Sequence, residues 1–302
     1  MKVKVFVIII SYNGMKWLPS CLSSTEGCDV VVVDNASTDG SRDYIKNNFP
    51  SIKLLHQQKN LGFGQANNIG IKYALDNGAE AVFLLNQDAY MQDDTIDVLS
   101  SFSKKNPEFG ILSPIHLTGD GKYLDENFSY YLSYKCNKYF YSDAVLRGLK
   151  EYYEVPFVNA AGWYIPKQVF NVVGGFDPIF FHYGEDDNFC QRIYYHNFKI
   201  GVIPKSKILH DRGKRNFQSV SDSFLTWERQ LKVKWGNINN SSFEEEFPKM
   251  YKQERIKYYK YRAKIQLGKA KKVALKLSIL KRIEIEITKS KKLNSSGKNL
   301  YL

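Results

Sequence analysis

AVFLLNQDAY, residues 81–90, is the stretch that decides the fold of this chain. Its apolar run Ala81–Leu85 predicts a buried β-strand, which stops abruptly at Asn86, Gln87 and Asp88. Because side chains alternate along a strand, Asn86 and Asp88 are expected on the same side, just past the strand end. Ligands of open α/β sheets bind there, and this pair of oxygen ligands suits a divalent cation that carries a diphosphate. The alternative is a strand followed by an ordinary turn, since Asn and Asp also favour turns.

Apolar runs and helix-like segments alternate over the first hundred residues. The expected strands are rich in β-branched residues and almost continuously apolar, as in a parallel sheet covered on both faces. They are Val3–Ile10, Val30–Val33, Ile52–Leu55 and Ala81–Leu85. The expected helices are Lys16–Ser24, Asp39–Asn48 and Gln65–Asn77, with Ser37 and Thr38 as candidate N-caps and Gly78 as a candidate C-cap. This order predicts a doubly wound α/β unit.

Regular patterning weakens after that unit. Residues 93–105 predict another helix, and residues 109–117 predict another strand. Residues 118–154 are rich in Tyr, Gly, Asp and Asn without a clear period, which predicts an insertion or a long, lid-like loop. The remaining expected elements are a strand in 155–166, helices at Lys167–Val172 and Glu185–Asn197, and a short strand at 199–204.

The positive charge of the chain is concentrated at its C-terminal end. Of 302 residues, 43% are hydrophobic, enough for a full-sized core, and the net charge is +12. Residues 1–227 carry 23 Lys and Arg against 24 Asp and Glu, whereas residues 228–302 carry 20 against 7. This contrast predicts an α/β domain over 1–227 and a basic, helical extension over 228–302.

Cysteine spacing and hydropathy indicate where the protein resides. The four cysteines form no CxxC pair, which argues for reduced thiols and against a structural zinc site. The N-terminal MKVKVFVIII predicts a first strand rather than a cleaved signal, and no apolar stretch approaches the roughly 20 residues that span a bilayer. These features predict a cytoplasmic protein.

Two segments at the expected strand ends carry candidate nucleotide ligands. VVVDNASTDGS (31–41) places Asp34, Asn35 and Asp39 after the second strand, where a carboxylate can accept from a pyrimidine imide or a ribose hydroxyl. A turn followed by a helix cap explains the same residues. KNLGFGQANNIGI (59–71) contains only part of a dinucleotide fingerprint, because Asn67 stands where its third glycine is expected. Its helix start still permits close backbone approach to a ligand.

A second acidic segment follows a glycine turn. HYGEDDNFCQR (182–192) presents Glu185, Asp186 and Asp187 at the start of a helix. One of them suits a general base, although acidic residues in a first helical turn are also ordinary partners of the helix dipole. Further along, the neutral imidazole of His210 suits a metal site, and Arg212, Lys214 and Arg215 suit contact with a diphosphate.

Taken in this order, the segments resemble family 2 of the glycosyltransferases, which have the nucleotide-sugar-binding GT-A fold. The subgroup that they resemble most is that of the rhamnosyltransferase-like enzymes of bacterial cell-surface polysaccharide assembly. The resemblance spans residues 3–215 and rests on SYNG, VVVDNASTDGS, KNLGFGQANNIGI, LLNQDA, NAAGWYIP, GGFDPIFFHYGEDDNFCQR and His210.

The resemblance implies a role for each matching residue. Asp34 corresponds to the base-binding carboxylate, and the expected nucleotide ligands are Asp34, Asn35, Asp39, Asn60, Gly62, Asn67 and Asn86. The expected metal ligands are Asp88 and His210, the catalytic pair is Glu185 and Asp186, with Asp186 as the base, and the acceptor side is Trp163 and Asp187. Two departures are Asn86, which replaces the first acid of the DxD motif, and Asn188, where a further acid is usual. The second departure leaves open which acid of 185–187 is the base.

The resemblance implies an inverting glycosyltransferase. It would use Mg²⁺ or Mn²⁺, take its sugar from a nucleoside-diphosphate sugar and pass it to a glycan or lipid-linked saccharide. A non-catalytic scaffold that keeps the fold is the alternative. The basic extension is expected either to be a solvated helical appendage or to touch anionic lipid peripherally at the inner face of the cell membrane. Nucleic-acid binding ranks low, since the tail contains no recognisable reading motif.

Overall fold

The computed structural model describes residues 2–212, 223–297 and 300–302. Its contacts divide the chain into one unit formed by Met1–Asn216 with Lys298–Leu302, and a second formed by Phe217–Gly297. The boundary expected from charge, between residues 227 and 228, falls inside helix α9 (Ser223–Trp235), which lies whole in the second unit. The charge contrast therefore marks the presence of an appendage, whereas the contacts give its extent.

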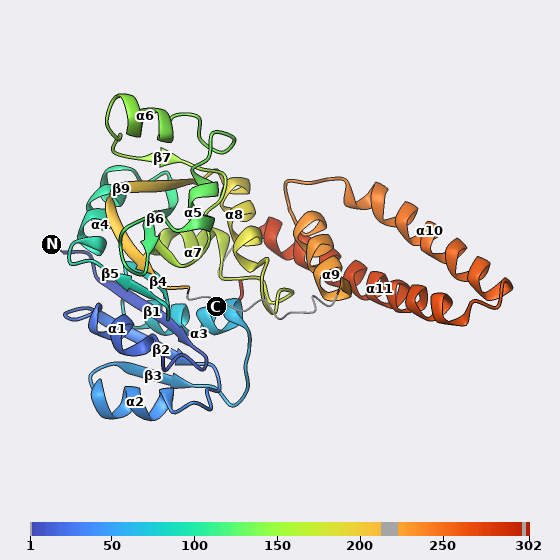
Figure 1. The fold of residues 1–302 in the computed structure, drawn as a ribbon, viewed down its shortest axis with the longest axis horizontal. Helices are drawn as coiled ribbons and strands as arrows, with labels where there is room; N and C mark the ends of the chain where they lie inside the picture. Colours follow the sequence, from blue (N-terminus) through green and yellow to red (C-terminus); the bar gives the residue numbers. More distant parts are fainter. Residues whose placement is uncertain (1, 213–222, 298–299) are drawn as a thin grey trace. The chain divides into compact units, whose positions relative to one another are not determined.

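The first unit is built on one mixed sheet (Figure 1). The strand order is β3-β2-β1-β4-β8-β6-β9-β5, and β7 pairs with β9 outside this path. The strands are β1 Val5–Ser11, β2 Asp29–Asp34, β3 Lys53–His56, β4 Ala81–Asn86, β5 Ala89–Met91, β6 Phe109–Thr118, β7 Tyr153–Glu154, β8 Gly162–Pro166 and β9 Lys199–His210. As predicted, β1 to β4 are parallel, whereas β8 runs antiparallel to β4 and β5 runs antiparallel to β9.

Helices cover both faces of this sheet, and strand β1 shows why its sequence is continuously apolar. Phe6, Ile8 and Ile10 enter one core with residues of α3, α7 and α8, while Val7 and Ile9 enter a second core with residues of α1, α2 and α4. Successive side chains thus alternate between two buried faces. The helices of this unit are α1 Leu18–Ser23, α2 Ser41–Asn48, α3 Phe63–Asp76, α4 Thr95–Lys105, α5 Glu126–Tyr131, α6 Phe140–Leu146, α7 Lys167–Val173 and α8 Glu185–Tyr195.

Several local predictions were wrong. Helix α2 begins after Gly40, so Ser37 and Thr38 are not its N-caps; both instead bond to Asn13 of the first loop. Of the two alternatives for the segment 118–154, the structure favours an insertion over one long loop, because the segment contains α5, α6 and β7. The short strand expected at 199–204 continues to His210 as β9, which pairs with β6 on both sides of a register shift.

The second unit is helical, as predicted for the extension. Besides α9 it contains α10 (Phe243–Ala263) and α11 (Leu267–Ser296), which pack as an antiparallel hairpin (Figure 1). Its core is formed by Leu231, Trp235, Phe243, Phe247, Ile279, Leu280, Ile283 and Ile287. Over the described ranges of the chain, no helix is both long enough and apolar enough to cross a membrane.

Candidate active site

The carboxyl ends of the parallel strands meet at one edge of the sheet. Ser11 lies beside Asp34 in the register of β1 and β2, and Asp34 lies beside His56 in that of β2 and β3. The Asp34 carboxylate is fully buried, 2.7 Å from Nδ1 of His56, and its other oxygen accepts from the Ser37 amide. These partners stabilise the buried carboxylate, and the bond from the Ser37 amide is also one that a turn after the strand makes.

Asn35 fixes the loop that precedes α3. Its Oδ1 accepts from the Leu61 amide at 2.8 Å, and its Nδ2 donates to Asn60 Oδ1 at 2.9 Å and to the Gly62 carbonyl at 3.3 Å. Gly62 has φ of +79°, and a Cβ there would lie 1.8 Å from the Phe181 carbonyl oxygen. Only glycine fits both constraints, so Asn35, Asn60 and Gly62 form one connected loop structure.

The predicted ligands Asp39 and Asn67 have structural partners. The carboxylate oxygens of Asp39 accept from the amides of Met15 and Ser41. Although burial raises the pKa of Asp39, the hydrogen bonds from Ser41 and Met15 outweigh it and hold that pKa below its usual range. Asn67 is 1% exposed and donates to the Phe63 carbonyl. Asp39 thus stabilises the turn before α2, and Asn67 stabilises the first turn of α3.

Asp88 and His210 meet because β5 pairs with the end of β9. Ala89, which follows Asp88, lies opposite His210, and the Asp211 amide donates to the Asp88 carbonyl. The Asp88 carboxylate lies 3.5 Å from Nε2 of His210, and both side chains are almost completely buried. Within residues 2–212, 223–297 and 300–302, neither ring nitrogen of His210 has a hydrogen-bond partner. The imidazole of His210 is thus buried beside the Asp88 carboxylate, and its ring nitrogens make no hydrogen bond to the described residues.

The Asp88–His210 pair fits a divalent metal ion whose other ligands come from water and a bound substrate. In the described part of the chain, no group of three or more His, Cys, Asp or Glu is arranged around one metal position. Two protein ligands nevertheless suffice for a Mg²⁺-type site, in which waters and substrate phosphates usually supply the rest. Adjacent ligands of an octahedral ion lie about 3 Å apart, close to the observed distance between Asp88 and His210. Those two residues therefore fit a divalent cation that also binds a diphosphate.

Asp125 is a residue that the sequence analysis missed. Its carboxylate lies 3.8 Å from Nδ1 of His210, accepts from Nε of Arg212 at 2.7 Å and caps α5 through the Phe128 amide. A carboxylate facing the outer nitrogen of an imidazole orients that ring for metal binding. Asp125 thereby connects the 118–154 segment to the Asp88–His210 pair. The sequence did not indicate Asp125 as a site residue, because it lies in the segment 118–154, whose hydrophobic pattern has no helix or strand periodicity.

The acid cluster begins helix α8, after Gly184. Glu185 is buried at 4% exposure, whereas Asp186 and Asp187 are half-buried. Desolvation of the Asp186 carboxylate by the surrounding protein raises its pKa to about 7, and the negative charge of Asp187 adds to this effect. Asp186 is therefore the member of the cluster whose proton affinity suits a general base near neutral pH.

Tyr131 relates the acid cluster to the histidine pair. Burial and the charge of Asp186 raise the pKa of its hydroxyl; the charge of Asp125 adds to this, and Arg212 opposes it. These electrostatic effects come from both groups of charges, so Asp186 and the Asp125–Arg212 pair both lie near this hydroxyl. Tyr131 belongs to α5, in the segment 118–154 that was expected to be an insertion or a long loop.

The turn before α8 is held by buried bonds. Arg192 is fully buried and donates to Asn188 Oδ1 and to the carbonyls of Val173 and Gly175. Asn68 bonds both the amide and the carbonyl of Phe176. These contacts fix the start of α8, which carries the acid cluster, on the scaffold of α3 and α7.

The side chain of Trp163 does not have the exposure expected of an acceptor contact. It is fully buried in β8 and packs against Phe176 and Phe189 at centroid distances of 6.1 and 5.7 Å. An alternating strand between two covered faces leaves no route from this position to a ligand. Lys214 and Arg215, which were expected near a diphosphate, lie outside the described residues.

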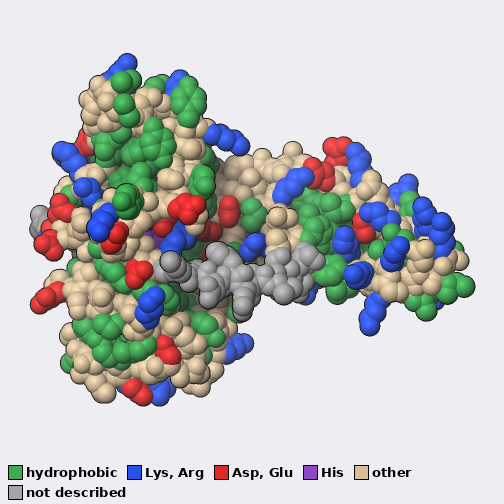
Figure 2. All heavy atoms as spheres, viewed as in Figure 1, with side chains coloured by type: hydrophobic (Ala, Val, Ile, Leu, Met, Phe, Trp, Pro, Cys, Tyr) green, Lys and Arg blue, Asp and Glu red, His purple; other side chains and the backbone are tan. Residues whose placement is uncertain are grey.

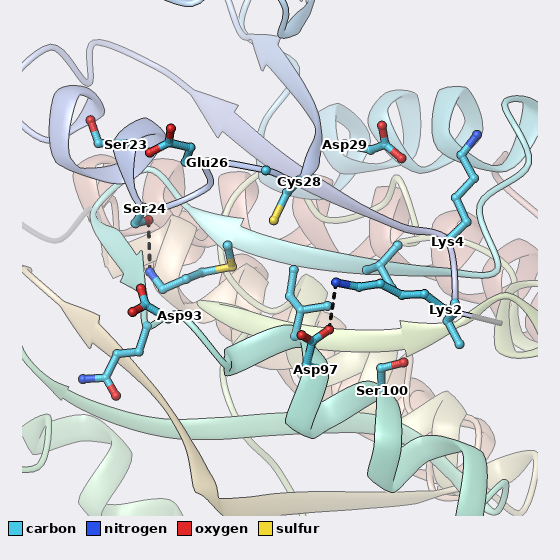
Figure 3. A pocket seen from close by; sticks show the side chains of 16 residues that line it. Lys2, Lys4, Ser23, Ser24, Glu26, Cys28, Asp29, Asp93, Asp97 and Ser100 are labelled. Atoms are coloured by element: carbon cyan, nitrogen blue, oxygen red, sulfur yellow. Dashed lines mark hydrogen bonds and ion pairs between the residues drawn. The ribbon is translucent and has the colours of Figure 1, made fainter.

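A wide hollow of about 890 Å³ lies elsewhere, at the opposite end of β1 from Ser11 (Figure 3). It is lined by the start of β1, the residues after α1 and the first turns of α4, and it contains an ion pair between Lys2 and Asp97 at 3.2 Å. None of the predicted site residues lines it. Its volume alone does not make it the functional site, since the convergent polar groups lie at the other edge of the sheet.

The sequence of this chain is similar to those of several known proteins. The model of the family described as glycosyl transferase family 2 matches residues 6–173. Over 228 residues, 72% of each chain, the sequence is 27% identical to the dTDP-rhamnosyl transferase RfbF of Shigella flexneri. It is 28% identical to the low-salt glycan biosynthesis hexosyltransferase Agl10 of Haloferax volcanii, covering 74% of this chain and 73% of that one. It is 23% identical to the N-acetylglucosaminyl-diphospho-decaprenol L-rhamnosyltransferase of Mycobacterium tuberculosis, covering 68% and 75%.

Solved structures share the fold. The mannosyltransferase PcManGT from Pyrobaculum calidifontis, in complex with GDP-Man and Mn²⁺, superposes with a TM-score of 0.55 at 18% identity, over 79% of this chain and 64% of that one. GalNAc-T7 with UDP, GalNAc and Mn²⁺ gives 0.57 at 17% identity, over 77% and 49%. The chain thus spans about half to two thirds of these structures. The predicted GT-A fold is confirmed.

Proposed function

The chain belongs to glycosyltransferase family 2, and we propose that it is an inverting enzyme that transfers a sugar from a nucleoside-diphosphate sugar to a glycan or lipid-linked saccharide of a cell-surface polysaccharide. Two of the relatives named above are rhamnosyltransferases and one is a hexosyltransferase. Rhamnose is therefore the first sugar to test, and a deoxythymidine diphosphate the first nucleotide.

The observation that carries the proposal is the presence of two unlike groups near Tyr131, whose hydroxyl responds to the charges of both. One group is Asp186, whose pKa is raised to about 7. In the other, Asp125 and Arg212 adjoin the buried His210, which faces Asp88. A base and a diphosphate site close to one another are what an in-line sugar transfer requires.

Each group would have a distinct part in the reaction. Asp186 would accept the proton of the attacking acceptor hydroxyl, and the new bond would form at the anomeric carbon on the face opposite the departing diphosphate. Asp88 and His210 would hold Mg²⁺ or Mn²⁺, which when bound neutralises the negative charge on the leaving nucleoside diphosphate. Asp125 would keep the imidazole of His210 oriented. Glu185, buried beneath the cluster, would position α8 rather than touch the acceptor.

The edge formed by β1 to β3 would hold the nucleoside. Asp34 would accept from the base or ribose, with the Asn60–Gly62 loop held over it by Asn35. Asn86, as a neutral oxygen at the end of β4, would support the diphosphate side. Asp39 and Asn67 would act through the loops that they hold. On the acceptor side, Asp187 and the segment 118–154 remain the proposed contacts.

The test compares Asp186→Asn with the unaltered chain on a panel of nucleotide sugars. Release of nucleoside diphosphate from one donor by the unaltered chain is expected, with the variant at least 100-fold slower while binding that donor equally well. Binding without release by the unaltered chain, with any acceptor supplied, would instead indicate a scaffold that keeps the fold. We also infer a cytoplasmic position at the inner face of the cell membrane, where a lipid-linked acceptor is accessible.

A further inference from the structure

The distal part of the α10–α11 hairpin, residues 255–276, has an unbalanced charge. It contains nine basic residues and no acidic residue, and the basic residues are Arg255, Lys257, Lys260, Arg262, Lys264, Lys269, Lys271, Lys272 and Lys276. The remainder of the described second unit, residues 223–254 and 277–297, has ten basic residues against seven acidic ones. The excess charge of the whole chain is thus concentrated at one end of one hairpin.

The two parts also differ in how their charges are paired. In the proximal part, Lys232 bonds Glu228 and Glu286 at 2.9 and 2.8 Å, and Arg282 bonds Glu228. Among the described residues, Lys257 is the one member of the distal nine that forms an ion pair, with Glu254. Lys269 and Lys276 instead lie over the rings of Tyr261 and Trp227. Folding therefore pairs several of the proximal charges with acidic side chains, whereas Lys257 is the one distal residue with such a partner in the part of the chain that the structure describes.

Exposed apolar side chains accompany this charge. Ile265, in the connection between the helices, is 81% exposed, and Leu267 at the start of α11 is 57% exposed. On the outer side of α10, Ile256 and Tyr259 are 58% and 60% exposed. Figure 2 shows the Lys and Arg side chains gathered over this hairpin, with apolar side chains among them. Apolar side chains at a turn, with Lys and Arg in the adjoining helices, are characteristic of elements that lie in a membrane interface.

We propose that residues 255–276 dock on an anionic lipid bilayer, with Ile265 and Leu267 entering the headgroup boundary and the surrounding basic side chains binding lipid phosphates. Anionic headgroups supply the acidic partners that the chain lacks there. A second copy of the hairpin is disfavoured, because nine positive charges would face nine. Nucleic acid fits less well, since its phosphates give no partner to exposed Ile and Leu side chains. The choice of a bilayer rests in part on the proposed lipid-linked acceptor.

The test uses the full chain and vesicles, without donor or acceptor. Sedimentation with phosphatidylglycerol vesicles is compared with phosphatidylcholine vesicles for three variants. K264Q/K269Q/K271Q removes three distal charges, K281Q/K289Q/K292Q removes three exposed proximal charges from the same helix, and I265S/L267S removes the apolar turn. At about fivefold per charge near an anionic surface, the distal triple variant should bind on the order of 100-fold more weakly, and the proximal variant should change much less. I265S/L267S should weaken binding while preserving its dependence on anionic lipid.

Three outcomes would overturn the proposal. The first is equal weakening by the two triple variants, which would reduce the effect to net charge. The second is loss of helical circular dichroism in the distal variant together with unchanged vesicle binding by I265S/L267S. The third is tighter binding to duplex DNA than to the anionic vesicles at the same salt concentration. Because no sugar transfer is measured, each of these results leaves the proposed glycosyltransferase activity untouched, and failure of that activity leaves the lipid result intact.

Discussion

Replacing Asp187 with Asn should move the pH dependence of catalysis without removing the base. Desolvation by the surrounding protein is the main reason that the pKa of Asp186 rises to about 7, and the neighbouring negative charge of Asp187 is the second. Asparagine keeps the size of the side chain and removes that charge. The pKa of Asp186 should therefore fall in the variant, since one of the two effects that oppose its ionisation is gone.

The size of the effect follows from the fraction of Asp186 that is ionised. With a pKa of about 7, Asp186 is ionised, and so able to act as a base, in about one tenth of the protein molecules at pH 6. The value of kcat/KM at pH 6 should thus be about a tenth of its plateau above pH 8. If the variant lowers the pKa of Asp186 by one pH unit, kcat/KM at pH 6 should rise to about one half of its plateau value, and a larger decrease in pKa should raise it further. The expected change is a shift of the acidic limb toward lower pH.

The assay is nucleoside diphosphate release at low donor concentration from pH 5 to 9, because kcat/KM reports the free enzyme. Asp76→Asn is a matched control, since Asp76 is an exposed residue paired with Lys72 on α3. Asp186→Asn should abolish the limb along with the activity. An acidic limb that stays in place in Asp187→Asn, or that moves equally in Asp76→Asn, would refute the assignment of the limb to Asp186.

Three further predictions concern other parts of the site. His210→Ala should weaken Mn²⁺ binding in the presence of nucleoside diphosphate by 10-fold or more, measured calorimetrically, because about half of the protein ligands are lost; unchanged Mn²⁺ affinity would count against the Asp88–His210 site. Arg192→Met should lower the free energy of unfolding by about 3 kcal/mol or more, measured by urea denaturation, since the carbonyls of Val173 and Gly175 lose a buried donor; a smaller loss would mean that the turn is held elsewhere. Trp163→Phe should cost about 1–3 kcal/mol of stability and leave the KM for the acceptor unchanged, because the side chain is buried; a raised KM at unchanged stability would restore its predicted acceptor role.

The sequence predicted the nucleotide-binding half of the fold well, because that half depends on local pattern. Continuous β-branched runs such as Val30–Val33 can be buried on two faces only in a covered parallel sheet, and the structure confirms this. The extent of β9 was missed, since Pro204, Lys205 and Ser206 interrupt its apolar run although the strand continues through them. Pairing with β6, a tertiary contact, decides that extent.

The candidate site was predicted unevenly for a related reason. The strand end predicted Asp88 as a metal ligand and imidazole chemistry made His210 a candidate, while the resemblance assigned both to one metal. Only the pairing of β5 with β9 explains why residues so distant in sequence meet. Asp125 and Tyr131 were missed because α5 is six residues long and lies in a segment without helical period. Trp163 was misplaced because a large aromatic residue at a strand position is equally compatible with core and with surface until its neighbours Phe176 and Phe189 are known.

Release of nucleoside diphosphate from a panel of nucleotide sugars, with dTDP-rhamnose included, tests the proposed function most directly. The unaltered chain should release the diphosphate of one donor when Mg²⁺ or Mn²⁺ and an acceptor are present. Asp186→Asn should bind that donor with the same affinity and release its diphosphate at least 100-fold more slowly. Equal release by the unaltered chain and by Asp186→Asn would contradict the account.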